Sequence, residues 1–162
     1  MSDRFSAYIM IGGRLPKRQV PDLLKAITNA GVSFEWGECI LQPTTEAELL
    51  QAQHKGKLFL CDTEARYGEF PELEQVCRTL GLAYTRYSEG KYEYDAILVD
   101  FRPGMKEPLF RRSSNSSEAI YVPASEVKKA LRHIEAGRVG KAKGLLRSLC
   151  PEVPKLPAFK IV

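Results

Sequence analysis

The chain presents the same order of structural signals twice, 50 residues apart. In each copy a short apolar run precedes a loop, a proline, apolar residues at helical spacing and a glycine. Because proline is favoured in the first turn of a helix and glycine just after its end, each copy predicts a strand, a helix and a new strand. The matched features are the runs 8–11 and 58–61, Pro21 and Pro71, and Gly31 and Gly81.

These signals predict an α+β fold in which two βαβ-like units form a mixed sheet covered by helices, with a ferredoxin-like arrangement as one form of it. A doubly wound α/β fold is the alternative, since connection lengths do not separate the two. Chance similarity is a rival to a true repeat. Thr45 and Glu48 have the spacing of a capping box and predict a short helix between the units. Strands at 82–87 and 92–101 predict a β-hairpin that extends the sheet.

The last third of the chain differs from the rest in composition and in its predicted elements. Residues 102–118 hold two prolines, a glycine and a serine cluster, so we expect a flexible loop there, after a body formed by residues 1–101. Residues 119–162 predict a strand at 119–122, two helices joined as a helical hairpin, and an extended Pro-rich tail, all packed on the same domain. The expected final strand is 159–162, after Pro151, Pro154 and Pro157.

Charge is divided between the two parts. Residues 1–100 carry 11 Lys and Arg against 15 Asp and Glu, and residues 101–162 carry 13 against 5. Such a division bears on steering and on partners, but it does not identify a ligand. We therefore expect a partner to contact the basic C-terminal part.

The expected partner site lies on the two C-terminal helices. Their cations fall largely opposite the apolar positions, which predicts a cationic ridge for an acidic protein surface or a complex that contains nucleic acid. The structural alternative is that these cations are simply the solvated side of two helices. The predicted binding residues are Arg111, Arg112, Lys128, Lys129, Arg132, Arg138, Lys141, Lys143 and Arg147.

A second candidate surface is the predicted β-hairpin at 82–101. Four of the seven tyrosines fall within it, and aromatic side chains on an open sheet can stack unpaired bases or anchor a protein partner. Tyrosine is also a good strand former, which is the structural alternative. The residues of this secondary surface are Tyr84, Arg86, Tyr87, Tyr92 and Tyr94.

Weaker signals suggest other chemistry. Asp62 and Glu64 follow an apolar strand at i, i+2 spacing, with Glu69 and Asp100 as candidate companions for a metal or an acid–base pair. Glu35 and Glu38 around Trp36 are a weaker acidic candidate. The sequence Gly12-Gly13-Arg14 between the first strand and helix is a weak anion loop, since it lacks the phosphate-binding glycine patterns.

The cysteines and histidines do not predict a redox or metal site. Cys39, Cys61, Cys77 and Cys150 contain no C-x-x-C pair, and free reduced thiols are the simplest interpretation. His54 and His133 lack the Cys/His spacing of a zinc site, so we expect neither a metal nor a cofactor.

The sequence thus predicts a small binding protein, acting as a regulator, inhibitor or adaptor. The alternatives are a small, metal-assisted enzyme that uses Asp62 and Glu64, and a structural subunit of a larger assembly. No apolar run has the length of a membrane span and no secretory signal is visible, so we expect a cytoplasmic protein.

Overall fold

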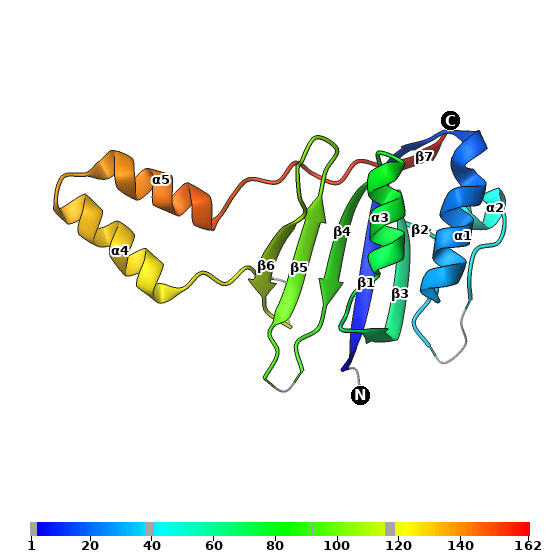
Figure 1. Cartoon of the computed structure of the whole chain (residues 1–162), viewed down its shortest axis with the longest axis horizontal. Coiled ribbons are helices and arrows are strands. Elements are labelled where there is room, and N and C mark those ends of the chain that lie inside the picture. The colour runs from blue at the N-terminus through cyan, green and yellow to red at the C-terminus, as the bar shows by residue number, and fades with distance from the viewer. Residues whose placement is uncertain (1–2, 38–40, 92, 116–118) are drawn as a thin grey trace.

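The computed structural model of this chain describes residues 3–37, 41–91, 93–115 and 119–162. Figure 1 shows a twisted sheet, two helices across one of its faces, and two further helices beyond one edge. The elements are β1 (Arg4–Leu15), the 3-10 helix η1 (Lys17–Gln19), α1 (Val20–Ala30), α2 (Glu46–Gln51), β2 (Gln53–His54), β3 (Lys57–Arg66), α3 (Pro71–Thr79), β4 (Ala83–Ser88), β5 (Ala96–Phe101), β6 (Leu109–Ser113), α4 (Ala124–Glu135), α5 (Val139–Leu149) and β7 (Phe159–Ile161). The predicted α+β class is confirmed.

The sheet has the strand order β2-β3-β1-β4-β5-β6, and every neighbouring pair along it is antiparallel. The short strand β7 pairs with β1 in parallel. Strands β3 and β4 lie on either side of β1 and are therefore parallel to each other, and α3 connects them in the sequence. Helix α1, in contrast, lies between β1 and its antiparallel neighbour β3 in the sequence. The sheet is thus larger than two βαβ units, and its strand order does not confirm a ferredoxin-like arrangement.

The core lies between the sheet and the helices α1 and α3, which pack side by side (Figure 1). Alternate residues of a strand point to opposite faces, so Ile9 and Ile11 of β1 share a face with their β4 partners Arg86 and Tyr84. All four side chains are buried beneath the helices. We call this the helix face of the sheet, and the other the open face.

The helix ends follow the local sequence signals. Helix α1 carries Pro21 in its first turn and ends at Gly31, whose φ of 68° is left-handed. Helix α3 begins at Pro71, and Gly81 after it also has a φ of 68°. The short helix α2 is capped as predicted, since the Thr45 hydroxyl accepts a hydrogen bond from the Glu48 N–H at 3.2 Å.

The tail, residues 150–158, runs from α5 past the ends of β5 and β4 to β7 (Figure 1). It crosses the open face, where the Arg102 guanidinium donates to the Pro154 carbonyl at 2.8 Å. A Cβ at Gly12 would lie 2.0 Å from the Pro157 carbonyl oxygen, so only glycine allows this close approach. The predicted anion loop is wrong: Gly12 and Gly13 lie within β1, and the Gly13 N–H donates to Ala158.

The segment 102–118 is not simply a loop. It contains β6, which pairs with β5 along five residues and forms one edge of the sheet. Only Ile120, which bridges to Ser113, represents the strand expected at 119–122. Within the described ranges, no helix is both long enough and apolar enough to cross a membrane.

Candidate functional site

Helices α4 and α5 form a pair that projects beyond the β6 edge of the sheet, and we call residues 124–149 the arm (Figure 1). The helices pack against each other. Between them they bury only two side chains, Ala130 and Ala142. The turn at Gly137, with a φ of 72°, lets the Arg138 N–H donate to the His133 carbonyl at 2.8 Å. Small residues at the centre of the contact bring the helices close, and the half-buried Leu145 and Leu149 flank it on α5.

Most of the larger aliphatic side chains of the arm are exposed to solvent. Five aliphatic residues of the arm keep 40% to 52% of their surface accessible. An α-helix advances about 100° per residue, so Val127, Leu131 and Ile134 form one strip along α4, beside Ala130, which faces α5. Val139 and Leu146 form the matching strip on α5. Exposed apolar clusters of this kind mark interaction surfaces in soluble proteins.

The seven predicted cations of the arm are all exposed. Among the described residues only one of them, Lys129, forms an ion pair, at 3.9 Å from Glu126 of the same helix. No described acidic side chain of the sheet reaches the arm within ion-pair distance. The cations occupy the outer sides of both helices, while Lys128 and Lys143 lie next to the apolar strips at helical spacing.

The pKa of His133 reflects this concentration of charge. Desolvation lowers its pKa, and the charges of Arg138, Lys141, Lys129 and Arg132 lower it further. Both effects favour the neutral imidazole over the imidazolium form. Lysines and arginines on two different helices act on one point, which indicates a shared electrostatic field on the arm.

Arg111 and Arg112 do not extend from a flexible loop. Both lie in β6 on opposite faces of the sheet, so they do not point the same way. Arg111 forms an ion pair with the buried Asp100, which also pairs with Arg102 at 3.2 Å. Arg112 is exposed and lies 3.4 Å from Asp95. Arg111 is therefore a structural residue of the open face.

The predicted tyrosine surface is divided by the sheet. Tyr84 and Arg86 are buried on the helix face, which rules them out as a contact surface. Tyr87 lies on the open face, where its hydroxyl donates to the Ser114 carbonyl at 3.2 Å. Tyr94 is half exposed and packs edge-on against Phe5 at 5.6 Å. Tyr92 falls outside the described residues.

The acidic candidates are not brought together. The Asp62 carboxylate accepts a hydrogen bond from the Glu64 N–H at 2.8 Å, as in a local turn. Asp100 is held by its two arginines on the other side of β1, and Glu69 lies in the exposed turn before α3. Within the described ranges, no group of three or more His, Cys, Asp or Glu side chains is arranged to hold a metal ion.

Of the cysteines described, Cys61 and Cys77 are buried and Cys150 is exposed. Cys39 lies outside the described residues.

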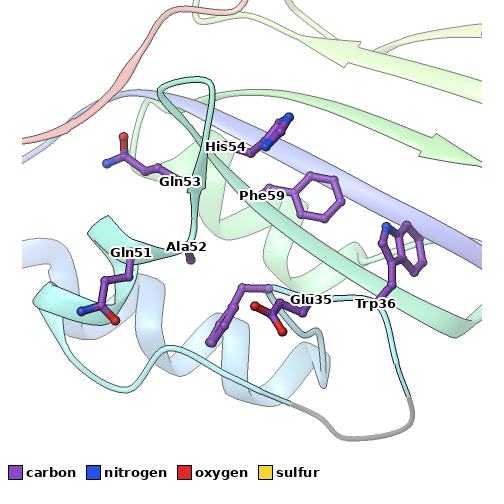
Figure 2. Close-up of a pocket in the computed structure, with 8 residues that line it drawn as sticks. Glu35, Trp36, Gln51, Ala52, Gln53, His54 and Phe59 are labelled. Atoms are coloured by element: carbon purple, nitrogen blue, oxygen red, sulfur yellow. The ribbon is translucent and has the colours of Figure 1, made fainter.

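Sequence reasoning missed an aromatic row on the open face. Trp36, Phe59, Tyr8 and Tyr87 follow one another across β3, β1 and β4, with ring centroids 6.2, 5.5 and 5.4 Å apart. The row ends at a pocket of about 660 Å³ beside β2 (Figure 2). The sequence singles out only Trp36 of this row, as the residue between the acidic candidates Glu35 and Glu38, because the other members come from distant segments. Glu38 lies outside the described residues.

Comparison with known proteins adds no relative: no family model, no curated protein and no solved structure matches this chain.

Proposed function

We propose that this chain is a small binding protein, acting as a regulator, inhibitor or adaptor, that engages an acidic protein surface through the arm. The observation that carries the proposal is the exposed aliphatic strip of the arm, Val127, Leu131, Ile134, Val139 and Leu146. It is bordered by seven cations, of which only Lys129 forms an ion pair with a described residue. Burial of such a strip supplies affinity, while the surrounding charges select an acidic partner and speed association.

The strip favours a protein over bare nucleic acid. Phosphate contacts would satisfy the cations but would leave the five aliphatic side chains in water. A partner with its own apolar residues and carboxylates satisfies both features. An amphipathic helix is one such partner, since its apolar residues can follow the strip between α4 and α5.

Three probes separate these possibilities when titrated against the full chain. They are a synthetic acidic amphipathic helix, the same peptide with its leucines replaced by serine, and a DNA duplex. We expect the amphipathic peptide to bind most tightly. Equal binding of the serine peptide would contradict the role of the strip, and tighter binding of the duplex would assign the arm to nucleic acid.

Two arm variants and a control complete the test. We expect the triple change Val127→Ser, Leu131→Ser and Ile134→Ser, and the charge reversal of Lys128, Lys129, Arg132 and Arg138 to Glu, each to abolish peptide binding with little change in the thermal melt. The matched control reverses four exposed cations elsewhere: Arg18, Lys25, Lys106 and Lys155. A control variant that loses binding as completely as the arm variants would show a non-specific charge effect. Self-association that the serine variants abolish would identify a second copy as the partner.

A further inference from the structure

The pocket at the end of the aromatic row combines rings with one carboxylate. Its lining includes Phe34, Glu35, Trp36, Ala52, His54 and Phe59, and its volume is about 660 Å³. The pocket lies at the β2 side of the sheet and the arm beyond β6, so the two are at opposite ends of the molecule (Figure 1). It is therefore separate from the surface of the proposed function.

Two rings of the pocket stand at a steep angle to the Phe59 ring. The Trp36 ring stands at 64° to Phe59 with 6.2 Å between centroids, and the His54 ring also stands at 64°, at 6.4 Å. Figure 2 shows Phe59 between His54 and Trp36, while the amide groups of Gln51 and Gln53 point away from the rings in this view. Half of the Trp36 surface is accessible, so a ligand can reach the indole.

Glu35 provides the charge of the pocket. Its side chain is exposed and forms no ion pair with any described residue. Its backbone N–H is fixed by the Ser33 hydroxyl at 3.3 Å, and Ser33 itself pairs with Cys61 of β3. The segment that carries Glu35 and Trp36 is therefore anchored to the sheet beside Phe59.

We propose that this pocket binds a quaternary or methylated ammonium group. Aromatic faces attract such a cation through their negative quadrupole, and the attraction grows as the site excludes water. A methylated ammonium loses less hydration on entry than a primary ammonium, which needs hydrogen-bond acceptors that rings do not offer. Glu35 supplies the opposite charge. Choline-type molecules and methylated lysine side chains carry this group.

The chain contains a natural reporter for the test, because Trp36 is its single tryptophan. We would titrate the full chain with tetramethylammonium, then with choline and N-acetyl-trimethyllysine amide, and follow Trp36 fluorescence. The neutral control is 3,3-dimethylbutanol, which has the shape of choline without its charge. We expect choline to bind at least about tenfold more tightly than this alcohol, and the tighter of choline and trimethyllysine identifies the source of the group.

Two variants locate the binding. Glu35→Gln keeps the size of the side chain and should weaken tetramethylammonium binding about tenfold. Phe59→Leu should weaken it similarly, with the thermal melt recorded to confirm folding. The matched control is Glu64→Gln, which removes an exposed carboxylate from the same strand as Phe59 and should leave the affinity unchanged. Equal affinity for choline and the alcohol, no saturable change in fluorescence, or wild-type affinity in Glu35→Gln would overturn the proposal. Charge reversal of the arm should leave this binding intact, which keeps the result distinct from that of the proposed function.

Discussion

Glu74 of α3 and Arg86 of β4 form an ion pair in the interior, with Oε1 2.7 Å from Nε. The Tyr84 hydroxyl donates to the other Glu74 oxygen at 3.1 Å, and Arg86 donates to the Gly68 carbonyl. The pair joins the only charged groups that are buried between a helix and the sheet in the described part of the chain. It therefore fixes α3 over β4.

Glu74→Gln should destabilise the fold strongly. The change leaves the Arg86 charge buried without its partner, and loss of one member of a buried pair typically costs about 3 to 5 kcal/mol. Chemical unfolding monitored by circular dichroism measures the free energy of unfolding. Glu72→Gln, on the exposed side of the same helix, is the control and should change it by about 0.5 kcal/mol at most. A loss below about 1 kcal/mol in Glu74→Gln would contradict the buried-pair argument.

The helices that cover the sheet could be predicted because their signals are local. Proline, apolar spacing and glycine lie within one short segment around Pro21 and Gly31, and the same holds for Pro71 and Gly81. Strand β6 could not be predicted in the same way. It is a short edge strand among Pro103, Pro108 and serines, and only its pairing with β5 defines it.

For the candidate sites too, the sequence predicts local features but not those that depend on how distant segments pack. The cations of α4 and α5 are visible in the sequence, whereas the exposure of Leu131 is not, because a helical apolar spacing ordinarily predicts burial. The sequence predicts Arg86 on the secondary surface, but the residue is buried on the helix face, because β-register decides which side of the sheet a residue faces. The pocket joins Trp36, His54 and Phe59 through strand pairing, which no local pattern records.

Gly12→Ala should loosen the tail. The added Cβ would overlap the Pro157 carbonyl oxygen at 2.0 Å, so the tail must move away from β1. We expect a loss of about 1 to 3 kcal/mol in the free energy of unfolding, as for other overpacked sites, and faster tryptic cleavage at Lys155. Gly140→Ala in α5 is the control, because open space surrounds that position and alanine favours a helix. Unchanged cleavage at Lys155 would show that the tail is not held there.

Stability should fall as pH rises above about 9. Burial raises the pKa of the Cys61 thiol from 9.0 to about 11, and the Asp62 and Glu35 carboxylates add to this. Burial also raises the pKa values of Cys77 and Tyr84. Between pH 9 and about pH 11 the unfolded chain has lost the Cys61 proton that the folded chain retains. The contribution of this group to the free energy of unfolding is therefore complete below pH 9 and is lost as the pH rises through about 11. Unfolding free energies measured along this range should decline.

Cys61→Ala tests the assignment. Its free energy of unfolding should decline less steeply between pH 9 and about pH 11 than that of the wild-type chain, because one of the shifted groups is gone. Cys150→Ala is the control, since that cysteine is exposed, and it should follow the wild-type slope. In the intact protein at pH 8, iodoacetamide should label Cys150 well before Cys61, as peptide mapping by mass spectrometry would show. Equal labelling rates would contradict the burial of the Cys61 thiol.

Binding of an acidic partner should raise the pKa of His133. In the free chain, desolvation and the charges of Arg138, Lys141, Lys129 and Arg132 hold this pKa below its usual value. Carboxylates docked on the arm would offset that positive field and favour the imidazolium form. The chain has only two histidines, so their ring signals can be followed separately by NMR as pH is varied.

The acidic amphipathic peptide should shift the titration of His133 upward while the His54 signal, at the other end of the molecule, stays unchanged. In the free variant with Lys129 and Arg132 changed to Glu, the His133 titration should already lie higher than in the wild-type chain, and an unmoved His133 in both experiments would show that the cations of the arm do not act together.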